Sequence, residues 1–285
     1  MESIYLNIAG IPIRLRTAFP LDVTERYAPF LVQKFTAPGE TLEFYSSESF
    51  PQMPQPAVWH HGGVGFTCLG GREVVLRRLG AGAPPYLMEE VLEPMHRRYQ
   101  YLRSSNETPV NLIQVFNNIS FETLLKRHGA MMLHCSLVRW NGQAILFSAP
   151  SGTGKSTQAD LWETYMGSET LDGDRAGLRS VDGVWRAYGL PFAGSSGIYR
   201  NDSAPIRAVV MLSQGPDNRI ERLSPARCLH RILPEVTLHR WDPEFMNWGL
   251  DRLTDLLTAV PCYHLSCRPD RGAVELLHNT LTQEV

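Results

Sequence analysis

The sequence has no excess of charge of either sign. Lysine and arginine number 27 and aspartate and glutamate 29 among 285 residues, so the formal net charge is -2. A strongly basic surface is the usual electrostatic mark of proteins that bind nucleic acid or anionic membranes. The sequence therefore predicts neither a nucleic-acid partner nor a membrane partner.

Long apolar runs are also absent, and no stretch approaches the length that is needed to cross a bilayer. The first residues, 1–7, lack the basic region followed by an apolar core that marks a secretory signal. We therefore expect a cytoplasmic protein.

Cysteine is sparse, and no two cysteines stand in a Cys-x-x-Cys pair. Their number is odd, which does not suit a framework of disulfides, and their spacing does not suit a zinc site. The pattern favours reduced thiols at all five positions. These are Cys68, Cys135, Cys228, Cys262 and Cys267.

What the sequence does contain is enough apolar residues, 43%, for one large domain or two modest ones. Apolar segments with closely spaced turn signals at 5–16, 43–45 and 58–79 predict a small antiparallel sheet. Residues 86–98 are rich in Leu, Met and Glu and predict a helix. Polar residues 103–109 are the best candidate for a linker.

These signals divide the chain into two expected domains. Residues 1–108 form a β-rich accessory domain, and residues 109–285 carry the motifs. In the second region, apolar periodicity and capping signals predict further elements. They are helices at 121–126, 226–233, 245–257 and 272–281, and strands at 131–138, 206–212, 219–223 and 263–267.

The most informative stretch is residues 147–157, Phe-Ser-Ala-Pro-Ser-Gly-Thr-Gly-Lys-Ser-Thr, which follows the apolar run 144–147. An apolar strand that runs through glycines into Lys-Ser at the start of a helix is typical of a phosphate-binding loop. Ala149 replaces the first glycine of the usual pattern. We expect Lys155 to reach the β- and γ-phosphates of ATP and Ser156 to hold Mg²⁺. The predicted nucleotide-binding residues are Ser151, Gly152, Thr153, Gly154, Lys155, Ser156 and Thr157.

The strand before this loop is predicted to belong to a hairpin. Asn141 and Gly142 separate two apolar runs, and Asn-Gly is a strong signal for a tight turn between antiparallel strands. Neighbouring strands in doubly wound nucleotide-binding folds are instead parallel and joined by helices. The sequence therefore predicts an α/β fold with a mixed sheet, of α+β character.

Two aspartates follow the loop helix. Asp172 and Asp174 are separated by Gly173, and residues two apart on a strand share a face, so both carboxylates could converge on one ion. Phosphoryl transfer uses one carboxylate to hold Mg²⁺ and one to take the hydroxyl proton of the acceptor. The alternative, an Asp-Gly turn with solvated acids, stays open and applies above all to Asp172.

His134, the hairpin, the Ser-Gly-x-Gly-Lys-Ser loop at the spacing from His134 to Lys155 and the acidic cluster together resemble the HPr kinase/phosphorylase family. The resemblance is closer to its smaller bacterial relatives, some of which accompany peptide-modification clusters. It covers residues 119–215 and implies a phosphate-loop fold similar to phosphoenolpyruvate carboxykinase. It also implies a place for His134 near the phosphates or the acidic pair. The aspartates of that family are adjacent, whereas Gly173 separates them here.

A second group of candidates comes from residues 194–197, Gly-Ser-Ser-Gly, which can form another anion-binding turn. Ser195 and Ser196 would contact phosphate there, and Arg175 and Arg200 could neutralise the charge of the transferring group. A flexible loop with solvated serines and surface arginines is the alternative.

The predicted function is an ATP- and Mg²⁺-dependent kinase that phosphorylates a Ser or Thr hydroxyl of a peptide or small protein. Asp174, Lys155, His134 and Asp172 would be catalytic, and Ser156 and Asp174 would hold the metal. A kinase for a small hydroxylated metabolite and a nucleotide-gated binding module without turnover are the alternatives. The motifs specify neither the acceptor nor the oligomeric state.

Overall fold

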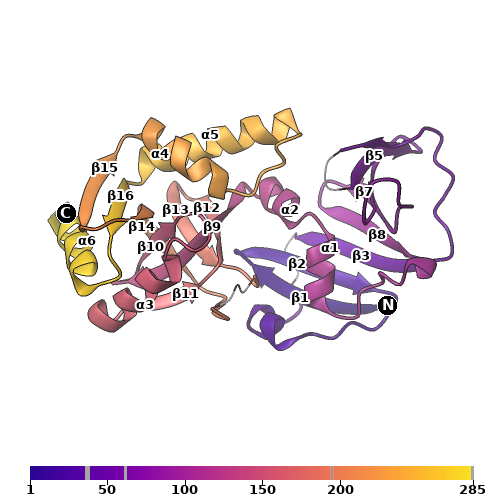
Figure 1. Cartoon of the computed structure of the whole chain (residues 1–285). Coiled ribbons are helices and arrows are strands. Elements are labelled where there is room, and N and C mark those ends of the chain that lie inside the picture. The colour runs from indigo at the N-terminus through magenta and orange to yellow at the C-terminus, as the bar shows by residue number, and fades with distance from the viewer. Residues whose placement is uncertain (36–38, 61–62, 193, 195, 284–285) are drawn as a thin grey trace. The chain divides into compact units, whose positions relative to one another are not determined.

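The structure is a computed structural model that describes residues 1–35, 39–60, 63–192, 194 and 196–283 (Figure 1). Its chain divides into two compact units, Met1–Ile119 and Ser120–Val285. The division lies after helix α1 (Leu112–Asn118), whereas the sequence placed the boundary at 108/109. Helix α1 belongs to the first unit because its Phe116 stacks on Tyr27, with 5.1 Å between the ring centroids.

The first unit contains an eight-stranded sheet among the residues described. The pairs β2–β3 and β3–β8 are parallel and the other pairs are antiparallel, so the expectation of a purely antiparallel sheet is wrong. Turn signals report only on strands that a short turn joins, whereas residues 18–39 separate β2 from β3 and residues 48–95 separate β3 from β8. In spatial order the strands are β1 (Glu2–Ile8), β2 (Ile11–Thr17), β3 (Glu40–Ser47), β8 (His96–Leu102), β7 (Leu87–Glu93), β6 (Arg72–Arg77), β5 (Val64–Leu69) and β4 (Val58–Trp59).

The helix predicted over residues 86–98 is wrong, because this segment forms strands β7 and β8. The two strands pair antiparallel, and Glu89 lies opposite Tyr99. Glu89 is also buried, with Oε1 at 3.1 Å from Nε of Arg97. Cross-strand pairing of this kind outweighs the intrinsic preference of Leu, Met and Glu for helix.

The second unit is built on a mixed sheet, as the sequence predicted. Strand β10 pairs antiparallel with β9 and parallel with β14, and β14 pairs parallel with β16. The turn predicted at Asn141 and Gly142 is confirmed, with φ of 47° and 76°. The strands are β9 (Ala130–Trp140), β10 (Gln143–Ser148), β11 (Glu169–Asp172), β12 (Arg175–Val181), β13 (Val184–Gly189), β14 (Ser203–Gln214), β15 (Arg219–Leu223) and β16 (Cys262–Cys267).

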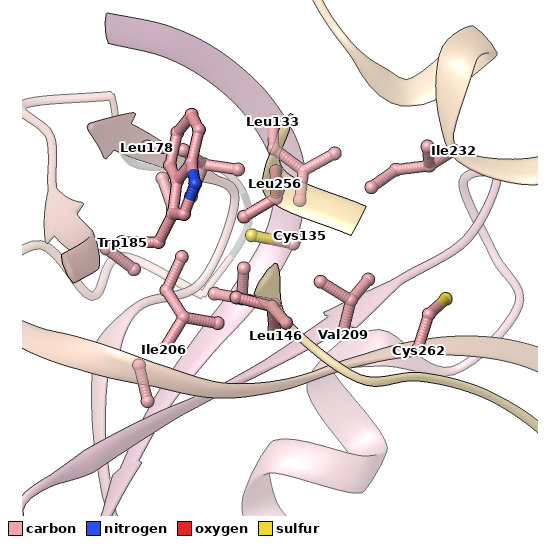
Figure 2. Close-up of a cluster of buried hydrophobic side chains, with 14 of the residues drawn as sticks. Leu133, Cys135, Leu146, Leu178, Trp185, Ile206, Val209, Ile232, Leu256 and Cys262 are labelled. Atoms are coloured by element: carbon pink, nitrogen blue, oxygen red, sulfur yellow. The ribbon is translucent and has the colours of Figure 1, made fainter. Parts of the chain in front are cut away.

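Helices cover both faces of this sheet (Figure 1). Consecutive residues of β10 point to opposite faces: Leu146 packs with Leu256 of α5 on one side, and Phe147 packs with Trp162 of α3 on the other. Figure 2 shows part of the first cluster, with Leu146, Val209 and Leu256. The helical elements are α2 (Phe121–Arg127), α3 (Lys155–Met166), α4 (Pro225–Ile232), η3 (Leu233–Glu235), α5 (Pro243–Ala259) and α6 (Arg271–Gln283).

Within the described ranges, no helix has both the length and the apolar character needed to span a membrane.

One expectation about cysteine is wrong. Cys228 of α4 and Cys262 of β16 form a disulfide, with 6.4 Å between their Cα atoms. Cys68, Cys135 and Cys267 are free thiols. The two bonded residues are 34 positions apart, and their spacing in sequence does not show that α4 packs on the end of β16.

Candidate functional site

The loop between β10 and α3 contains two glycines with left-handed backbone conformations. Gly152 has φ of 79° and Gly154 has φ of 116°, and a side chain at either position would be strained. Gly154 is also the residue that precedes α3, and no side chain caps that end of the helix. The N–H groups of the first turn of a helix have no partner inside the helix, and together with the helix dipole they favour a bound anion.

Lys155 opens α3 and its side chain folds back over the loop. Its Nζ donates hydrogen bonds to the carbonyl oxygens of Ala149, at 2.9 Å, and Pro150, at 3.5 Å. Burial lowers the pKa of Lys155, because the charged ammonium is partly removed from water. The cation is therefore held beside the loop, where a phosphate group would compensate for its lost hydration.

A cavity of about 390 Å³ joins this loop to two other parts of the chain. From β9 comes His134, and from the turn after β11 come Gly173 and Asp174. The loop and α3 contribute the remaining lining residues, which are Ser151, Gly152, Gly154, Lys155, Ser156 and Thr157. Thr153 lines an adjoining cavity of about 420 Å³, which shares Gly152, Gly154 and Thr157 with the first.

Asp172 does not line the 390 Å³ cavity. Its carboxylate accepts hydrogen bonds from backbone N–H groups instead. Its Oδ1 accepts hydrogen bonds from the N–H of Asp174, at 2.9 Å, and of Arg175, at 3.0 Å, while its Oδ2 accepts one from Leu190 at 2.9 Å. Burial raises the pKa of Asp172 to about 8, and the three N–H groups oppose this shift because they stabilise the ionised form.

The expectation that Asp172 and Asp174 share a face is therefore not met. Strand β11 ends at Asp172, and the chain turns at Gly173, so the period of two no longer applies. A Cβ at Gly173 would overlap Oγ of Ser196, which leaves room only for glycine between the two aspartates.

Asp174 faces His134 across the cavity. Its Oδ1 lies 3.9 Å from Nε2 of His134, and its Oδ2 lies 3.4 Å from Nε of Arg175. Gly194 packs directly against this carboxylate, since a Cβ there would come within 2.8 Å of Oδ1. The carboxylate is thus fixed by its neighbours and stays partly exposed to the cavity.

Sequence reasoning missed Glu235, which lies in η3 at the other side of His134. Its Oε2 is 2.9 Å from Nδ1 of His134, and its side chain is 9% exposed. A β-bridge between Leu133 and Val236 brings η3 beside β9. No local motif around Glu235 signals this contact, because it depends on pairing over a long sequence separation.

The remaining candidates are placed as follows. Ser196 lies against Gly173 at the edge of the cavity, and Ser195 lies outside the described residues. Arg175 contacts Asp174. The Arg200 guanidinium is bound instead to Glu169, at 2.9 Å, and to the carbonyl of Thr170, at 3.1 Å. Both partners belong to β11, upstream of its last residue, and the structure does not bring Arg200 into the cavity lining.

Comparison with known proteins gives a family match and a likeness to solved structures. No curated protein matches the chain. The solved structure of the Hpr(Ser) kinase/phosphatase from Coxiella burnetii is similar with a TM-score of 0.31 and 12% sequence identity, over 54% of this chain and 88% of that one.

A family model described as SynChlorMet cassette protein ScmC matches residues 101–269, which is more than half of the chain and includes the whole cavity lining described above. Its description as a cassette protein is consistent with the expectation of a chain that accompanies a gene cluster. The chain belongs to the family of SynChlorMet cassette protein ScmC.

Proposed function

We propose that the chain is a kinase that transfers the γ-phosphoryl group of ATP, with Mg²⁺, to a Ser or Thr hydroxyl of a peptide or small protein. The observation that carries this proposal is the composition of the 390 Å³ cavity. It combines the N-terminus of α3, which no side chain caps, with Lys155 and the hydroxyl of Ser156 on the same helix, and with the carboxylate of Asp174 from a separate element.

The donor set fits a magnesium ion that is held mainly by the nucleotide. Ser156 and Asp174 offer hard oxygen ligands to the same cavity. The described residues contain no group of three or more His, Cys, Asp or Glu side chains able to hold a metal. Magnesium in kinases is usually bound by one or two protein groups plus phosphate oxygens, and it would neutralise charge on the transferring phosphoryl group.

In the proposed in-line transfer, each residue of the cavity has its own role. Asp174 accepts the proton of the acceptor hydroxyl as the bond from its oxygen to the γ-phosphorus forms and the bond from that phosphorus to the leaving ADP oxygen breaks. Lys155 leaves the carbonyls of Ala149 and Pro150 to bind the phosphates. Glu235 fixes the ring of His134 through Nδ1, which keeps Nε2 facing Asp174.

A nucleotide-gated binding module is the second candidate, and a specific observation favours it. Asp172 is engaged by backbone N–H groups, so Asp174 is the only one of the two aspartates whose carboxylate faces the described cavity. A site with one carboxylate can bind ATP and magnesium. It does not supply one carboxylate as a metal ligand and a second as a general base.

The test compares Asp174→Asn with Lys155→Met. With radiolabelled ATP and Ser- or Thr-containing peptides, we expect Asp174→Asn to reduce transfer by about 10²–10⁴-fold while magnesium-free ATP binding is kept. We expect Lys155→Met to lose ATP binding itself. At ATP concentrations about 100 times its Kd, binding stabilises the native state by about 2.7 kcal/mol, so thermal shift reports this loss.

Asp182→Asn, in the exposed turn between β12 and β13, is the matched control and should behave as the unaltered protein. Binding of magnesium ATP without transfer to any hydroxyl acceptor would favour the binding module. Calorimetry that detects no binding of ATP with magnesium would overturn both candidates.

A further inference from the structure

The second cavity that bears on the proposed reaction, beside the one of 390 Å³, has a volume of about 590 Å³ and lies beside the phosphate loop on the face of the sheet that carries α4. Ala149 and Pro150 of the loop line it, together with Met211 and Leu212 near the end of β14. Strands β10 and β14 are parallel, so their carboxyl ends meet at one edge of the sheet. In α/β proteins this edge is where ligands bind.

The two cavities share their dividing wall. Ala149 and Pro150 line the second cavity, while their carbonyl oxygens hold Lys155 of the first. Glu235 lines the second cavity as well, and its carboxylate holds His134 of the first. A ligand in the second cavity would therefore lie next to the groups that surround the phosphates.

The outer wall of the second cavity is basic. Arg227, His230 and Arg231 stand at positions i, i+3 and i+4 of α4 and so share one face of the helix, while Cys228 and Ile232 are buried on the other face. Arg227 is paired with Glu221 through the two terminal nitrogens of its guanidinium. Arg231 is exposed, and in the described part of the chain no carboxylate lies within ion-pair distance of it.

The floor of this cavity is apolar. Met211 belongs to the core cluster on this face of the sheet, and Pro234 adds a further apolar surface. The acid at its inner end, Glu235, is already engaged by His134. An apolar floor beside Arg231, which forms no ion pair with a described residue, suits an extended segment that carries both apolar contacts and carboxylates. It suits a compact uncharged metabolite poorly.

We propose that this cavity binds the phosphoryl acceptor, and that the acceptor is a peptide or protein segment with acidic residues flanking its Ser or Thr. This inference rests on the proposed kinase function for the identity of the ligand as acceptor. The nucleotide then occupies the α3 side of the loop and the acceptor occupies the α4 side. The attacking hydroxyl enters between them, beside the wall formed by His134 and Glu235.

The binding test uses a fluorescein-labelled peptide with one central serine flanked by glutamates, and the same peptide with glutamines. Fluorescence anisotropy with magnesium and a non-hydrolysable ATP analogue gives the Kd of each. We expect the glutamate peptide to bind about tenfold more tightly, which corresponds to about 1.4 kcal/mol. We expect Arg231→Glu to remove that preference.

Arg219→Glu is the matched control, because Arg219 on β15 is 80% exposed, pairs with Asp217 and does not line the cavity. It makes the same change of charge and should keep the preference. Equal thermal unfolding midpoints for the two variants would show that both are folded. An unchanged preference in Arg231→Glu, or an equal loss in both variants, would overturn the site.

The transfer test separates this inference from the function on which it rests. Equal transfer to the glutamate peptide and the glutamine peptide would support the kinase function and overturn the proposal of an acidic acceptor. Selective binding without transfer would leave an acidic-peptide site on a protein that is not a kinase, and would overturn its role as an acceptor site. Transfer to glycerate, a small hydroxy acid, but to neither peptide would overturn the peptide acceptor.

Discussion

At the scale of single residues, two aspartates that are almost adjacent in sequence have different surroundings. Asp174 faces the cavity, whereas Asp172 is fully buried and binds three backbone N–H groups around it. One of these N–H groups belongs to Asp174 itself. Asp172 is therefore a positioning residue that fixes the turn carrying Asp174.

This arrangement predicts a defect in both stability and turnover for Asp172→Asn. An asparagine amide has only one oxygen, so its NH₂ group would face an N–H and leave a buried donor without an acceptor. An unsatisfied buried polar group costs about 1–3 kcal/mol, and the free energy of unfolding measured by urea denaturation should fall by that amount. Transfer should also slow, because the turn would hold Asp174 less firmly.

Asp182→Asn should leave the urea midpoint unchanged, because Asp182 is exposed. If Asp172→Asn also leaves it unchanged, the three hydrogen bonds to the carboxylate do not contribute to stability.

The sequence proposed the loop residues and Asp174 for the site because a local pattern marks them, but it did not propose Glu235. A phosphate-binding loop is encoded within about ten consecutive residues, so its parts are adjacent in any fold that contains it. Glu235 is 101 positions from His134 and has no local signature. Its contact follows only from the bridge between Leu133 and Val236, which is a property of the folded chain.

At the scale of elements, the hairpin of β9 and β10 delivers the phosphate loop to the sheet. Gly142 of its turn has φ of 76°, in the left-handed region, and a Cβ added there would meet no described atom within 4 Å. The backbone conformation, and not lack of space, is therefore what requires glycine.

We expect Gly142→Ala to lower the free energy of unfolding by about 1–2 kcal/mol, because an L-residue is strained in this conformation. Urea denaturation measures the change. Gly80→Ala, in a turn that is also open but without a positive φ, should be neutral. Equal stability of the Gly142→Ala protein and the unaltered one would mean that the turn adopts another conformation.

Elements were predicted well where one turn or cap defines them, and poorly where a distant partner does. The hairpin and the helix predicted at 226–233 from capping signals are local, and the structure confirms both, with Ser224 as the N-cap of α4. Residues 86–98 have the composition of a helix but form β7 and β8. Glu89 pairs with Arg97, and the two strands are flanked by β6 and β3 in the sheet. Local propensity is a weak prior when packing across a sheet opposes it.

At the scale of the whole molecule, the disulfide is the main departure from what composition indicates. An odd number of cysteines without paired motifs gives no reason to expect a cross-link. The bond joins α4, which carries the basic wall of the second cavity, to β16 of the central sheet. It therefore ties the proposed acceptor side of the site to the core of the second unit.

Removal of this bond should destabilise the second unit and leave the first unit unaffected. Closing a loop between residues 34 positions apart restricts the unfolded chain by about 3–4 kcal/mol, so Cys228→Ala combined with Cys262→Ala should lose about that amount in denaturation without reductant. Cys68→Ala, at an exposed free thiol of the first unit, is the control and should be neutral. Thiol alkylation of the unfolded, unreduced protein checks the premise: Cys68, Cys135 and Cys267 should react, whereas reaction at all five cysteines would show that Cys228 and Cys262 are not linked.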